Sequence, residues 1–116
     1  MLHLTPAMCE AAYELLHATP PFRRKKLPPA DEVSFVVIWT DRCGADYFRL
    51  KNGTHRIRIN GKWCGSLQPL LQAMAHEMTH MMVDLACPSD QAHHGSRFNR
   101  AAARVCRCHL FDPRRF

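Results

Sequence analysis

The pattern with the clearest chemical meaning is His76-Glu77-Met78-Thr79-His80, an HExxH motif. On an α-helix its two histidines lie only about 40° apart around the helix axis, so both imidazoles can bind one metal ion. Glu77 is turned about 100° from His76, which places its carboxylate beside a metal-bound water and outside the ligand set. The motif therefore predicts a zinc site that activates water for hydrolysis.

A catalytic zinc keeps three protein ligands and one open position, so a third ligand is required. The metzincin continuation of the motif needs Gly and His where this chain has Val83 and Ala86, which excludes that class. No glutamate follows Glu77, so a downstream glutamate ligand is excluded as well. The remaining candidates are histidines and aspartates: His93, His94, His109, Asp84, Asp90 and Asp112.

One long helix, from about Ser66 to Leu85, is predicted to carry the motif. Its apolar side chains recur with helical spacing and form one stripe: Leu67, Leu70, Leu71, Met74, Met78, Met81, Met82 and Leu85. His76 and His80 lie roughly opposite the centre of that stripe, so they are expected to face away from the core. Asp84 shares their face, either as a hydrogen-bond acceptor that fixes an imidazole tautomer or as an exposed carboxylate.

The elements around this helix are predicted from local signals. Thr5 and Pro6 are typical of a helix start, and Asn52-Gly53 is typical of a hairpin turn. The expected elements are a helix over residues 6–18, strands over 33–39, 47–50 and 56–60, and a helix over 96–109. This order predicts an α+β fold: an N-terminal helix, a small antiparallel three-stranded sheet, the HExxH helix and a C-terminal helix.

A second motif, His94-Gly95-Ser96-Arg97-Phe98, begins fourteen residues after His80. It resembles the HGxxF segment that carries the third zinc ligand in SprT-like and Spartan metalloproteases. The likeness extends to a glycine-containing strand at Cys43-Gly44-Ala45-Asp46-Tyr47, to a following strand at Ile57-Arg58-Ile59-Asn60 and to the helix from Leu70 to His80. Residues 6 to 109 are covered, and the two motifs occur in the correct order.

The resemblance implies a zincin-like minimal metalloprotease that hydrolyses peptide bonds. It assigns His76, His80 and His94 as ligands of Zn²⁺, and Glu77 as the catalytic base that activates the zinc-bound water. His93 is then either a further residue of the cleft or a solvent-facing loop histidine. The donor that stabilises the oxyanion would come from Tyr47, His55, His93 or Arg97, although Tyr47 is favoured as a structural strand aromatic.

The charge of the chain suits an anionic partner, because 16 Lys and Arg outnumber 10 Asp and Glu and give a net charge of +6. Basic residues recur along one face of the last predicted helix: Arg97, Arg100, Arg104 and Arg107. SprT-like proteins are associated with cleavage of DNA-bound or DNA-crosslinked proteins, so the resemblance implies DNA-dependent proteolysis. The sequence specifies no base-reading motif, so DNA binding is expected through non-specific backbone contacts. The alternative is a non-catalytic zinc-containing DNA-binding or interaction module with the same fold.

The length of 116 residues predicts a single domain over residues 1–116. Family members often carry a zinc ribbon after this region, so a minimal form without the ribbon is expected. The longest apolar stretch, from Phe35 to Trp39, is far short of the roughly 20 residues of a membrane helix. Glu10 and Glu14 stand where a signal peptide has basic residues, so a cytoplasmic location and no membrane association are expected.

The six cysteines are expected to be reduced thiols, because no secretion signal accompanies them. A structural metal site is the alternative, with these ligands: Cys87, Cys106, Cys108 and His109.

Overall fold

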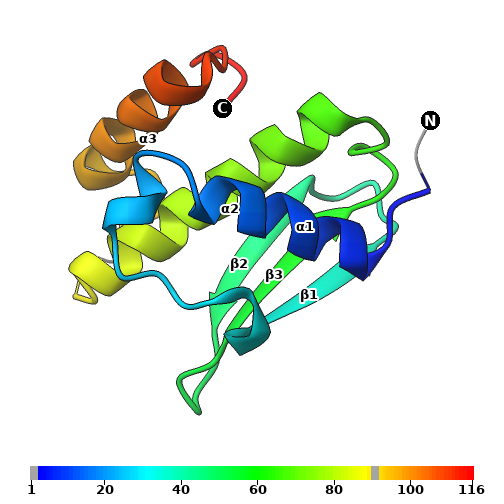
Figure 1. The fold of residues 1–116 in the computed structure, drawn as a ribbon, viewed down its shortest axis with the longest axis horizontal. Helices are drawn as coiled ribbons and strands as arrows, with labels where there is room; N and C mark the ends of the chain where they lie inside the picture. The colour runs from blue at the N-terminus through cyan, green and yellow to red at the C-terminus, as the bar shows by residue number, and fades with distance from the viewer. Residues whose placement is uncertain (1–2, 90–91) are drawn as a thin grey trace.

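The computed structural model describes residues 3–89 and 92–116, which form helices and one sheet (Figure 1). The α-helices and strands are α1 (Pro6–His17), β1 (Val33–Ile38), β2 (Ala45–Arg49), β3 (His55–Asn60), α2 (Leu67–Ala86) and α3 (Ser96–His109). Two short 3-10 helices, η1 (Phe22–Arg24) and η2 (Ala30–Glu32), lie between α1 and β1. The predicted α+β class is confirmed, and each predicted element is present within about two residues of its expected limits.

The sheet differs from the prediction in one respect, because its strand order is β1-β3-β2. β2 and β3 form the expected antiparallel hairpin around Gly53, whose φ is +86°. β1 pairs with β3 in parallel, from Val33 opposite His55 to Ile38 opposite Asn60. The predicted all-antiparallel sheet is therefore wrong: the sheet is mixed. β3 inserts between two strands that run in opposite directions, so it must be parallel to one of them.

A buried asparagine holds the crossover from β1 to β2. Asn60 is fully buried, and its side-chain amide donates to the carbonyls of Thr40 and Cys43 at 2.6 and 2.7 Å. Its main-chain N–H donates to the carbonyl of Gly44 at 2.8 Å. These bonds satisfy loop carbonyls that would otherwise lack partners beside the core, and they fix the position where β2 begins.

The core lies between the sheet and the helices. In Figure 1, α1 and α2 cross the sheet, with α1 packed on β1 and α2 packed on β2 and β3. The largest fully buried apolar side chains come from the helices and from the middle strand β3: Tyr13, Phe22, Ile57, Ile59, Met74, Met78, Met81 and Val105. All four methionines of the predicted α2 stripe are thus in the core, so the opposite side of α2, which carries His76 and His80, is turned away from it.

α3 packs against α2 and not on the sheet (Figure 1). Its inner side chains Phe98, Val105 and Cys106 are buried, whereas its predicted basic face is exposed: Arg97, Arg100, Arg104 and Arg107. No helix in the part of the chain that the structure describes is long and apolar enough to cross a membrane. The six cysteines, all within the described ranges, are free thiols.

Candidate metal centre

The phase of α2 determines where its polar side chains lie. The helix begins after Ser66, whose backbone is extended, and ends at Cys87, before Pro88. Thr79 is fully buried among the methionines, and its hydroxyl donates to the carbonyl of Ala75 at 2.7 Å, so this polar group has a partner inside the core. Because the methionine side is fixed in the core, the HExxH side faces the cleft.

Three histidine side chains converge where the polar side of α2 meets the segment that leads to α3. The ligand atoms of His76, His80 and His94 all lie within 4.8 Å of one another. The Nε2 atoms of His80 and His94 are 3.1 Å apart. Two nitrogens bound to one tetrahedral zinc at its usual bond length are about 3.4 Å apart, so the three imidazoles fit such an ion. Among residues 3–89 and 92–116, this is the one group of three or more potential ligand side chains that converges.

The start of α3 positions His94. Phe98 is only 5% exposed, and its ring stacks on the ring of His80 with centroids 4.3 Å apart. The same ring lies 4.7 Å from that of His94 and 5.1 Å from that of His76, so one buried aromatic contacts all three histidines. Gly95 allows the close turn, because a Cβ there would lie 2.6 Å from the Cβ of Ala92. Through this burial Phe98 anchors the start of α3 against α2.

The other predicted ligands lie elsewhere. His93 stacks on His80 with centroids 4.7 Å apart and lines the cleft, but it is not in the converging group. His109 contacts Phe22, Asp112 pairs with Arg114, and Asp84 pairs with Arg49 at 3.5 Å. Asp90 lies outside the described residues. The alternative cysteine site does not form a converging group in the described part of the chain.

Glu77, the residue after His76, is buried, with 5% of its surface exposed. Burial, with a smaller contribution from the Asp46 carboxylate, raises the pKa of Glu77 to about 8. Asp46 is itself held by an ion pair with Arg58. A carboxyl group with a pKa near neutrality can both take up and release a proton at physiological pH, which is what a general acid–base catalyst requires.

The surroundings of the histidines favour the form that binds metals. Burial, with the neighbouring histidines, lowers the pKa of His80 to about 3. Burial also lowers the pKa of His76 and His94. A neutral imidazole has a free nitrogen lone pair, so these rings can bind a cation at neutral pH without first losing a proton.

A cleft of about 700 Å³ contains these side chains. One wall is β2, which contributes all of Ala45–Arg49, and the other is the polar side of α2. The remaining lining residues come from the segment that leads to α3: Pro88, Ala92, His93 and His94. Because β2 is at the edge of the sheet, the cleft runs beside a strand whose outer side has no neighbouring strand in the described structure.

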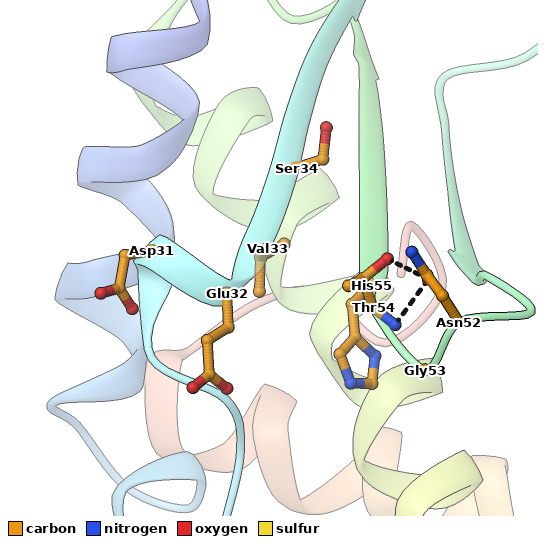
Figure 2. A pocket seen from close by; sticks show the side chains of 8 residues that line it. All are labelled: Asp31, Glu32, Val33, Ser34, Asn52, Gly53, Thr54 and His55. Atoms are coloured by element: carbon orange, nitrogen blue, oxygen red, sulfur yellow. Dashed lines mark hydrogen bonds between the residues drawn. The ribbon is translucent and has the colours of Figure 1, made fainter.

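A second hollow, of about 590 Å³, lies away from the three converging histidines, between the start of β1 and the turn from β2 to β3 (Figure 2). Asp31 and Glu32 project on one side of it, and the Asn52 side chain bonds to Thr54 on the other. Its one histidine, His55, does not form a converging ligand group with those carboxylates in the described chain.

The four candidate oxyanion donors have different surroundings. The Tyr47 hydroxyl and His55 Nδ1 are 2.8 Å apart, and His55 is 7% exposed. Burial and the neighbouring Asp84 raise the pKa of Tyr47, which lines the cleft. His93 also lines the cleft, whereas Arg97 is exposed on α3. Tyr47 and His93 therefore line the cleft, and His55 contacts the hydroxyl of Tyr47.

The sequence model of the SprT-like family matches residues 14–114. The chain belongs to the SprT-like family. The matched region of this SprT-like chain includes the three converging histidines and Glu77. A search of curated proteins found no match.

Sequence reasoning missed two contacts of this SprT-like site. Asp84 was expected to bond an imidazole or to be exposed, yet it faces the cleft, half-buried beside Tyr47, and pairs with Arg49. His76 Nδ1 lies 2.7 Å from the main-chain oxygen of Phe116. No sequence motif predicts either contact. The contact of Asp84 depends on how β2 lies against α2, and the contact of His76 involves a main-chain oxygen, which every residue carries.

Proposed function

We propose that this SprT-like chain is a zinc-dependent endopeptidase in which Glu77 is the general base. The observation that carries the proposal is the convergence of three imidazoles beside a buried carboxyl group, within a cleft that runs along an edge strand. Membership of the SprT-like family supports it, since a metallopeptidase is compatible with that family.

His76, His80 and His94 would hold the ion. When bound, zinc would supply a Lewis acid that polarises the scissile carbonyl and makes a water molecule more acidic. Glu77 would take a proton from the attacking water and deliver it to the leaving amine nitrogen, which balances the hydrolysis of one peptide bond. Tyr47 and His93, which line the same cleft, are the candidates to donate a hydrogen bond to the carbonyl oxygen as it gains negative charge.

The substrate would lie along β2. β2 pairs with β3 on one side and has no strand on its other side among the described residues, and its side chains line the cleft that contains Glu77. An extended peptide can add to such an edge through main-chain hydrogen bonds, which do not depend on side-chain identity. This mode of binding favours an unfolded or flexible segment of a protein as substrate.

The test of catalysis compares zinc-loaded wild type with Glu77→Gln, which keeps the size of the side chain and removes the base. We expect the variant to bind zinc normally and to lose peptide hydrolysis by about 10²- to 10⁴-fold. Glu14→Gln, an exposed change on α1, is the matched control and should cleave as wild type does. Equal cleavage by wild type and Glu77→Gln would contradict the proposal, and zinc binding without cleavage by either would support the non-catalytic module.

We further propose that the substrates are DNA-associated proteins and that the exposed face of α3 binds DNA. Arg100 and Arg104 are exposed on it, and the ring of His109 at its end stacks on Phe22, at 6.4 Å. This contact brings the exposed basic segment Arg23–Lys26 next to the same helix end. Such a surface can follow phosphates without reading bases. The family resemblance of the two motifs supports the choice of DNA as the polyanion.

The DNA proposal is tested with Arg100→Glu/Arg104→Glu, measured for binding to single- and double-stranded DNA over a range of salt concentrations. Wild type should bind at about 50 mM salt and weaken steeply as salt rises. The variant should bind more weakly, with a salt slope smaller by about two, and keep its zinc. Arg42→Glu/Lys51→Glu, the same charge change on exposed loops away from α3, is the control. No affinity of the wild type at low salt would overturn the proposal.

A further inference from the structure

The segment after α3 returns to the metal centre. The main-chain oxygen of Phe116 lies 2.7 Å from Nδ1 of His76, and the two rings are 5.2 Å apart. One turn earlier on α2, the side-chain amide of Gln72 donates to the main-chain oxygen of Arg115 at 2.6 Å. Two successive main-chain oxygens of one segment therefore contact two side chains on the same face of α2.

Local bonds shape this segment, which we call the His76 strap and define as residues 111–116. α3 ends at Leu110, whose φ of +57° is left-handed, and the N–H of Phe111 donates to the carbonyl of Cys106 at 3.1 Å. Asp112 then accepts from the N–H of Arg114 at 3.0 Å through its side chain. Its carbonyl accepts from the N–H of Arg115 at the same distance. These bonds turn the chain back towards α2.

Aromatic packing holds the strap against the protein. The rings of Phe111 and Phe116 stack with centroids 6.0 Å apart, and both side chains pack on the core. Phe116 and His76 both line two hollows, one of about 320 Å³ that Glu77 also lines and one of about 280 Å³ that His94 also lines. The Phe116 ring, 5.2 Å from that of His76, thus limits how the imidazole can turn.

The bond from His76 to Phe116 sets a tautomer. A main-chain oxygen can only accept, so Nδ1 of a neutral His76 must carry the hydrogen. The lone pair of the ring is then on Nε2. A hydrogen bond at the second nitrogen is the usual way in which a protein orients a histidine that binds a metal, and it makes the ring a stronger ligand.

We propose that the His76 strap is a positioning element, which fixes the Nδ1–H tautomer and the ring orientation of His76 before a metal arrives. The consequence for metal affinity rests on the proposed zinc site, but the tautomer itself is a property of the metal-free protein. The strap acts through His76, the side chain that the Phe116 main-chain oxygen contacts.

The first test observes the tautomer directly in metal-free, ¹⁵N-labelled protein, by long-range ¹H–¹⁵N correlation spectra at about pH 8. We expect His76 of the wild type to show the Nδ1–H pattern. The double variant Gln72→Ala/Phe116→Ala removes the two side-chain contacts of the strap that lie nearest His76 and should shift His76 towards a mixture of tautomers. Gln68→Ala, the same change at an exposed position of α2, should leave the spectrum of His76 unchanged.

The second test measures zinc affinity of the same proteins by competition with a chelator. The zinc affinity of the double variant should be about 10- to 100-fold lower than that of wild type, which is the change expected when the hydrogen bond that orients a ligand is lost. Replacing Phe116→Ala by Phe116→Leu, which keeps an apolar side chain, should recover most of the lost affinity. An Nε2–H pattern in the wild type, or an unchanged tautomer and zinc affinity in a folded double variant, would overturn the proposal. Failure of Glu77-dependent hydrolysis would overturn the proposed function and leave the tautomer result intact.

Discussion

The two sides of the metal centre are built differently. On one side, His76 and His80 are half-buried on a helix whose opposite face is fixed in the core by Met74, Met78 and Met81. On the other, His94 is exposed and is held at the start of α3 by the packing of Phe98. The helix side is determined by local periodicity, and the other side by a tertiary contact. The position of His94, which a short segment supplies, therefore depends more on individual tertiary contacts than the positions of His76 and His80 do.

The largest fall in zinc affinity is expected when a proposed ligand is itself removed. His80→Ala, on the helix side, and His94→Ala, on the other, should each lower zinc affinity by more than about 100-fold, beyond the range for residues that only orient a ligand. The neighbouring histidine provides the matched control, since His93→Ala removes an imidazole from the same cleft and should leave one zinc per chain. Metal analysis with chelator competition measures all three. Loss of zinc from His93→Ala with retention in His94→Ala would reverse the ligand assignment.

A smaller effect is expected from Phe98→Ala, which removes the contact that joins the two sides. The loss of a buried phenylalanine should lower the free energy of unfolding by about 3 kcal/mol, measured with urea. Zinc affinity should also fall, because the rings of His80 and His94 both pack against this ring. Phe48→Ala is the control, since Phe48 is 51% exposed and its loss should change stability little. Unchanged stability of Phe98→Ala would contradict the role of Phe98 as an anchor.

The smallest effect is expected from Gly95→Ala, which disturbs only the exposed side. The new Cβ would lie 2.6 Å from that of Ala92, so the segment must shift, at a cost of about 1 to 3 kcal/mol. The melting temperature and zinc affinity should both fall, and Ala92→Gly in the same chain should restore most of each. Failure of that second change to restore them would show that the contact between these two positions is not the cause.

The same contrast explains what the sequence could predict. The HExxH spacing and the Leu/Met stripe are local patterns, so they predicted α2 and the placement of His76 and His80. Spacing left six candidates for the third ligand, and the resemblance of the His94-to-Phe98 segment was needed to choose one. The parallel pairing of β1 with β3 and the contact of Phe116 with His76 join residues far apart in the chain, and no local pattern encodes such pairings.

The insertion of β3 between β1 and β2 also has a consequence for the chain as it is being synthesised. The middle strand of the sheet is the last to be made, so β1 and β2 have no partner within the sheet until residues 55–60 have left the ribosome. Until then the apolar Val36, Val37 and Ile38 of β1 belong to an unpaired edge, the kind of surface on which nascent chains aggregate. The hairpin turn at Gly53 brings β3 back against β2, and β3 then covers the open edge of β1 as well.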